Sequence, residues 1–115
     1  MPVILQVSFV WDEDEESVRA ASLAQARDLA SRDEFIWKLI LRDPGSKSSG
    51  AIYLFADRAK AEAWRRELLA RRGEHIEARI FEVDVEASRL TRAPIDAPGR
   101  ARSMPIDELN ASNDE

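Results

Sequence analysis

The chain has 115 residues, of which 44% are hydrophobic and 34% charged, and its formal net charge at pH 7 is -5. This length predicts one domain with a modest core, and the acidic balance argues against a nucleic-acid-binding protein, which needs a basic face. The chain has no cysteine, which excludes disulfides, thiolate metal sites and cysteine nucleophiles and is compatible with the cytoplasm, where we expect the protein.

The chain opens with an apolar segment that alternates in hydrophobicity. Apolar residues recur at every second position from Val3 to Trp11, which predicts a strand over residues 2–11. The segment has no basic region and no small-residue cleavage site, so we expect no signal peptide. No apolar run approaches the roughly 18 residues that a membrane span needs, so we expect no membrane contact.

A cluster of acidic residues follows this strand. The sequence DEDEES at residues 12–17 is typical of a helix start, where carboxylates accept free amide hydrogens. We expect this helix to run to about Arg32, with Val18 and Leu29 among its inward residues. A metal site among these acids is disfavoured, because neighbouring carboxylates point in different directions and no calcium-loop glycine follows.

The next segment predicts a β-hairpin. Residues 34–42, EFIWKLILR, alternate as a strand with Phe35 and Trp37 on one face and Ile36 and Lys38 on the other. The sequence DPGSKSSG then has the composition of a turn. A third strand is expected over residues 51–56.

A second helix and a last strand complete the pattern. Asp57 is a suitable helix cap, and the helix is expected to end near Arg72 because Gly73 follows. We place the fourth strand at about 76–85. The arginines of RRELLARR mostly fall on the solvated side of this helix.

The order β-α-β-β-α-β predicts a ferredoxin-like α+β fold, a four-stranded antiparallel sheet with two helices on one face. The other sheet face would then be apolar and uncovered, which indicates a homodimer packed sheet to sheet. The residues expected on that face are Ile4, Val10, Ile36, Ile40, Ile52 and Leu54. We assign residues 1–90 to the domain and 91–115 to an extension that contacts a partner or is flexible, with a short helical turn at MPIDELNAS.

Few residues could carry chemistry. His75 is the one histidine, and its place after a helix end is typical of a surface residue. No Ser-His-Asp set, phosphate loop or metal-ligand cluster is evident, so we expect no metal. The aromatic residues form either an ordinary core, which their spacing favours, or a flat apolar pocket. Lys38, placed on the dimer face, must be paired or must line a wet cavity; Glu77, Glu82, Gln6 and Ser8 are candidate partners.

Three segments resemble the YdhR family of putative monooxygenases: FIWKLILRD, GAIYLFADRAKAEAW and ARIFEVDV. The shared marks are Trp37 with Lys38, the strand-to-helix run from Gly50 to Asp57, the later aromatic Trp64, and the closing motif at residues 81–84. The resemblance covers about residues 3–90 and implies the dimeric α/β-barrel superfamily. The stretch between Trp64 and the last strand is shorter than is usual in the family, and its helix has arginine and leucine where family members often carry a histidine, so no role of a helix-borne histidine is carried over.

The resemblance implies a cofactor-independent monooxygenase, an oxidoreductase that acts on a small aromatic substrate. A non-catalytic dimeric binding module and an isomerase or lyase on the same scaffold stay open as alternatives. For the first hypothesis the catalytic candidates are Tyr53, Lys38 and His75. The substrate-binding candidates are Trp37, Phe55, Trp64, Phe9 and Arg79.

Overall fold

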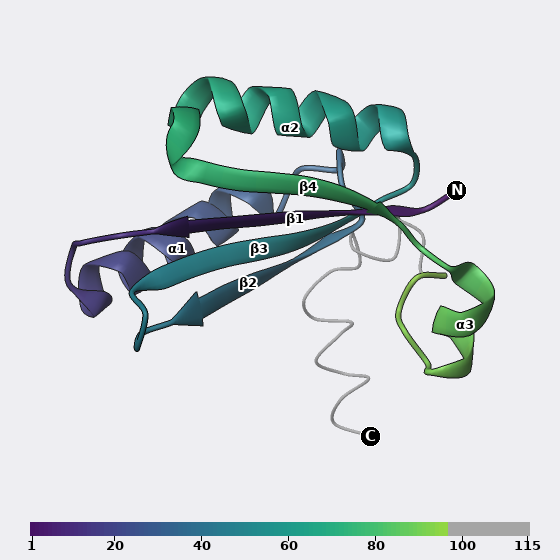
Figure 1. Ribbon diagram of the computed structural model, residues 1–115, viewed down its shortest axis with the longest axis horizontal. Coiled ribbons are helices and arrows are strands. Elements are labelled where there is room, and N and C mark those ends of the chain that lie inside the picture. The colour runs from purple at the N-terminus through teal and green to yellow at the C-terminus, as the bar shows by residue number, and fades with distance from the viewer. Residues whose placement is uncertain (97–115) are drawn as a thin grey trace.

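The computed structural model describes residues 1–96 (Figure 1). The MPIDELNAS segment and most of the extension lie outside these residues. The elements are β1 (Val3–Val10), α1 (Glu15–Leu29), β2 (Trp37–Asp43), β3 (Ser48–Phe55), α2 (Arg58–Arg72), the 3-10 turn η1 (Gly73–His75), β4 (Ile76–Glu82) and α3 (Val85–Leu90). Within this part of the chain, no helix is both long enough and apolar enough to span a membrane.

The four strands form one sheet in the order β2-β3-β1-β4, and every neighbouring pair is antiparallel. Helix α2 lies against β1 and β4, whereas α1 lies over β2 (Figure 1). The short helix α3 lies beyond the end of the sheet where β1 begins. This arrangement confirms the ferredoxin-like α+β fold predicted from the order of elements.

Local capping sets the ends of both long helices. Asp14 accepts hydrogen bonds from the backbone amide and the hydroxyl of Ser17, each at 2.8 Å, and these bonds lower the pKa of the Asp14 carboxyl. Asp57 caps α2 by accepting from the amide of Lys60 at 2.9 Å. Gly73 ends α2 with φ 71°, a conformation that glycine adopts without strain.

The core lies between the sheet and the two helices. The alternate residues Val3, Leu5 and Val7 of β1 point into it, as the sequence pattern predicts. From β3 and α2 the core also takes Ala51, Tyr53, Phe55, Ala61, Trp64 and Leu68. Helix α1 contributes one buried residue, Leu29, whereas α2 contributes three, so α1 packs less closely than α2.

The register of β2 overturns the predicted side of Lys38. Directly paired residues share a sheet face, and Lys38 pairs with Tyr53, whose side chain is in the core. Lys38 and Ile40 therefore face the helices rather than a dimer partner, and Ile36 lies beside α1 residues. The strand begins at Trp37 after a bend, so the alternation that we extended back to Phe35 does not hold there.

The segment after β4 also differs from the expectation. The strand ends at Glu82 rather than near Val85, because Asp84 caps a helix by accepting from the amide of Ala87 at 3.0 Å. Helix α3 had no counterpart in the predicted elements. After it, Arg89 binds the carboxylate of Asp96, which lowers the pKa of that group.

Candidate active site in the interhelical cleft

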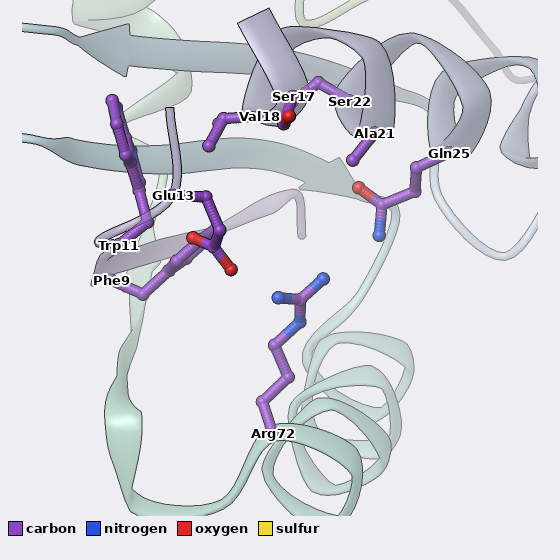
Figure 2. A pocket seen from close by; sticks show the side chains of 9 residues that line it. All are labelled: Phe9, Trp11, Glu13, Ser17, Val18, Ala21, Ser22, Gln25 and Arg72. Carbon is purple, nitrogen blue, oxygen red and sulfur yellow. The ribbon is translucent and has the colours of Figure 1, made fainter. Parts of the chain in front are cut away.

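A cleft opens between α1 and α2 above the sheet. We define its outer chamber as a cavity of about 370 Å³ bounded by the end of β1, one face of α1 and the end of α2 (Figure 2). Its lining residues are Phe9, Trp11, Glu13, Ser17, Val18, Ala21, Ser22, Gln25 and Arg72. The volume falls within the range of small-molecule sites, roughly 300–1,000 Å³.

A smaller chamber of about 40 Å³ lies at the centre of the sheet and shares Phe9, Ser22, Gln25 and Arg72 with the outer chamber. Lys38 and Tyr53 line this inner chamber, together with Phe9, Gln25 and Arg72. The ammonium of Lys38 donates to Gln25 Oε1 at 3.3 Å and lies 4.8 Å from the centre of the Tyr53 ring. An amide oxygen and an aromatic face both attract a cation without neutralising it. The inner end of the cleft therefore presents an ammonium group that contacts neutral partners and no carboxylate among the described side chains.

The mouth of the cleft is aromatic and cationic. The Arg72 guanidinium lies 5.0 Å from the centre of the Phe9 ring. Trp11 is held by its indole nitrogen, which donates to the hydroxyl of the buried Ser49 at 2.9 Å. His75 is exposed and lines a shallower hollow outside the mouth, next to Trp11 and Arg72. Of the three catalytic candidates, Lys38 and Tyr53 thus meet, and His75 lies apart from them.

Most of the remaining aromatic candidates belong to a filled core. Phe35, Tyr53, Phe55 and Trp64 pack with ring centroids 5.4 to 6.5 Å apart. Phe55 is 0% exposed and Trp64 is 6% exposed. Among the described side chains, the indole nitrogen of Trp64 has no hydrogen-bond partner. These packed rings favour the core interpretation for Phe55 and Trp64.

The salt bridge between Arg32 and Glu34 covers the Trp64 end of this aromatic cluster. Arg32 stacks 5.1 Å from the centre of the Trp64 ring and bonds the carboxylate of Glu34 at 2.5 Å. This hydrogen bond lowers the pKa of Glu34. The aromatic cluster is thus packed against the sheet on one side and a paired guanidinium on the other.

Two predicted substrate-binding residues lie on the opposite sheet face. Trp37 pairs with Leu54 and Arg79 with Gln6, and both partners point away from the helices. The Trp37 indole donates to the carbonyl of Pro94 at 2.9 Å, and Arg79 lies 5.0 Å from the Phe81 ring centre. Trp37 and Tyr53 line no common cavity; Trp37 instead borders a separate hollow of about 280 Å³ together with Lys38 and residues of α1. Phe9, by contrast, lies in the cleft as proposed.

Two cleft residues, Gln25 and Arg72, were absent from the sequence-based candidates, although the sequence carries a signal for each. Gln25 lies four residues before the buried Leu29, on the inward side of α1. Arg72 lies four residues after the buried Leu68, on the inward side of α2. A polar or charged residue at an inward helix position is the feature that could have identified both.

In the described part of the chain, no three acidic, histidine or cysteine side chains gather as a metal site would require.

The comparison with known families adds a decisive observation. A family model described as "Putative mono-oxygenase ydhR" matches residues 4–94. The chain belongs to the ydhR family. The match includes every residue that lines the cleft, and it confirms the resemblance to this family that the sequence predicts.

Solved structures and curated proteins add less about function for this ydhR family member. One similar solved structure is a protein of unknown function, NE2512 from Nitrosomonas europaea. It is 20% identical, with a TM-score of 0.55 over 72% of this chain and 89% of that chain, a likeness that concerns the fold alone. No curated protein matches the chain. Family membership therefore supports a monooxygenase at the level of the family, and the chemistry rests on the cleft.

Proposed function

We propose that this ydhR family member is a cofactor-independent monooxygenase that oxidises a small, electron-rich phenolic substrate in the interhelical cleft. The observation that carries the proposal is Lys38, whose ammonium contacts the amide of Gln25 and the ring of Tyr53. Among the described side chains, no ion pair includes Lys38. A cation that is only partly solvated and is held by neutral groups is suited to stabilise an anion.

The proposed chemistry needs only the substrate and molecular oxygen. Loss of a proton converts the phenol or its activated methylene into an anion, and the anion donates electrons to oxygen. For a methylene flanked by aromatic rings the balance is R₂CH₂ + O₂ → R₂CO + H₂O, in which two C–H bonds break and one C=O bond forms. One oxygen atom enters the product and the other leaves as water.

The residues of the cleft have distinct roles in this scheme. Lys38, whose side chain is half-buried at the inner end of the cleft, stabilises the substrate anion by direct charge attraction. Glu13 turns its carboxylate toward the outer chamber (Figure 2), where it can accept the substrate proton. The Tyr53 hydroxyl group is the second candidate for proton transfer, because Tyr53 lines the inner chamber. Phe9 and Trp11 supply the apolar surface on which an aromatic ring can stack.

One observation favours a second candidate, a non-catalytic binding module. The inner chamber, at about 40 Å³, is too small for an aromatic ring, so a ligand would rest mainly in the outer chamber. Such a ligand would be bound without direct contact between its reactive carbon and Tyr53. A module of this kind would bind the same ring compounds tightly and turn none of them over.

An oxygen-electrode assay separates the two functions. We expect metal-chelated, flavin-free protein to accelerate oxygen uptake by anthrone, and Lys38→Met to lower the rate at least tenfold through lost anion stabilisation. Lys60→Met is the matched control, because Lys60 is exposed on α2 and is not among the cleft residues. Anthrone binding without oxygen uptake would favour the binding module, and equal rates for both variants would refute the role of Lys38. Conversion of the substrate without oxygen would instead support an isomerase.

A further inference from the structure

We propose that Arg72 is a specificity residue that binds a carboxylate of the substrate, so that the preferred substrates are hydroxyaryl carboxylates rather than neutral phenols. The inference rests on the proposed use of the cleft and extends it to the class of ligand. Arg72 has no place in the chemistry proposed above, and its position in α2 is the first observation that carries the inference.

Arg72 continues the buried stripe of α2. Ala61, Trp64 and Leu68 are the buried residues of this helix, and they are spaced three and four residues apart. Arg72 follows Leu68 by four residues, so the same helical phase directs it toward the sheet. Figure 2 shows its side chain extending from the end of α2 into the outer chamber, toward Glu13 and Gln25. The guanidinium thus borders the outer chamber while the residue as a whole stays exposed to solvent.

Three other arginines of α2 form ion pairs within the helix, whereas the exposed Arg66 is in none among the described side chains. Arg71 bonds Glu67 at 2.6 Å, and Arg58 and Arg65 both lie near Glu62. Among the described side chains, no ion pair includes Arg72, and its guanidinium instead lies over the Phe9 ring. The Phe9 contact leaves the guanidinium N–H groups able to bind an anion in the plane of the group.

Arg72 and Lys38 share one chamber of the cleft. Both residues line the inner chamber, and Arg72 also lines the outer chamber and the hollow beside His75. A ligand that stacks on Phe9 or Trp11 would therefore place one end near each cation. An aromatic ring that carries a hydroxyl and a carboxylate satisfies both, with its phenolate at Lys38 and its carboxylate at Arg72. A bidentate guanidinium–carboxylate contact gives both affinity and orientation.

Binding measured without turnover tests this inference separately from the monooxygenase proposal. The probes are 4-hydroxy-1-naphthoate and 1-naphthol, which share a hydroxynaphthyl ring and differ in the carboxylate that the first carries across the ring from its hydroxyl. Titration calorimetry at pH 7 under nitrogen keeps oxygen out of the measurement. We expect wild-type protein to bind the acid at least tenfold more tightly than the naphthol, and Arg72→Gln to abolish this preference while binding of the naphthol stays within about twofold.

The control is Arg66→Gln, which removes the same charge from an exposed position of α2 that does not line the cleft. It should retain the tenfold preference, which excludes a general effect of net charge. Retained naphthol binding by Arg72→Gln shows that the variant is folded. Equal affinity of the wild type for both probes, or an unchanged preference in Arg72→Gln, would overturn the inference. If the acid binds by way of Arg72 but no phenol is oxygenated, then the inference holds and the monooxygenase proposal fails.

Discussion

Lys38 and Tyr53 face each other across the β2–β3 pair, and the ammonium of one lies 4.8 Å from the ring centre of the other. The contact joins an edge strand to the strand beside it and brings a charge to the floor of the cleft. Cation–ring contacts of this kind contribute on the order of 0.5–1 kcal/mol when they are partly exposed. The contact therefore contributes little to the stability of the fold. We attribute the presence of a charge at position 38 to function instead.

Replacing Lys38 should accordingly have little effect on stability. Lys38→Met loses the ring contact and the bond to Gln25 but places an apolar chain of similar length against Tyr53 and Ile40. These effects offset one another, so we expect the free energy of unfolding to change by less than about 1 kcal/mol. Urea unfolding followed by tryptophan fluorescence measures the change. A loss of several kcal/mol would assign Lys38 to the structure and would remove the argument for its functional role.

Gly50 should be far less tolerant than its place in a strand suggests. A Cβ atom at this position would lie 2.5 Å from the carbonyl oxygen of Val7 in the neighbouring strand. Because that atom belongs to the backbone of β1, the clash is relieved only by moving a central strand. We expect Gly50→Ala to lower the free energy of unfolding by about 1–3 kcal/mol, as overpacking of a core does.

Gly45→Ala is the control for this change. A Cβ atom there would meet only the Asp43 carboxylate at 3.5 Å, an ordinary contact. The substitution also reduces the freedom of the unfolded chain, so its effect should be neutral or slightly stabilising. The midpoints of thermal unfolding of Gly50→Ala and Gly45→Ala measure the difference in stability. Equal midpoints would mean that β1 shifts at no cost and that the close approach at Gly50 is not a constraint.

The fold could be predicted from the sequence because its determinants are local. The alternation from Val3 to Val7, the caps Asp14 and Asp57, and the stop at Gly73 each act within a few residues, and all of them have the predicted effect. Helix α3 was missed because its signal is short. It has six residues and none of them is buried, so its one indication was the cap Asp84.

The site could be predicted only in part, because it depends on register. Strand β2 carries apolar residues on both faces and a lysine and an arginine on one of them, so alternation could not tell which side meets the helices. The pairing of Lys38 with Tyr53 settles this, and it depends on where the hairpin turns and on the bend before Trp37. Phe9 was placed correctly because β1 has one clearly apolar face. Gln25 and Arg72 were missed because polar residues on helices were assigned to solvent.

The corrected register also moves the surface that a second copy would cover. We propose that the protein is a homodimer whose interface is the sheet face opposite the helices. Leu39 is 51% exposed and Leu41 is 43% exposed, and both share this face with Ile4, Ile52 and Phe81. Exposed apolar side chains that are contiguous on one sheet face are typical of an interface. The face therefore includes alternate residues of β2 that the sequence had assigned to the core side.

One substitution on the open sheet face and one on the helix side test which of the two surfaces forms the dimer interface. Leu39→Asp would bury an unpaired carboxylate in the interface, so we expect it to weaken dimerisation at least a hundredfold. Leu69→Asp is the matched control, because Leu69 is a leucine of α2 that is 40% exposed on the helix side. Sedimentation velocity at low micromolar concentration should show monomer for the first variant and dimer for the second. Dimers in both would place the interface elsewhere, and a monomeric wild type would mean that the open sheet face has no second copy against it.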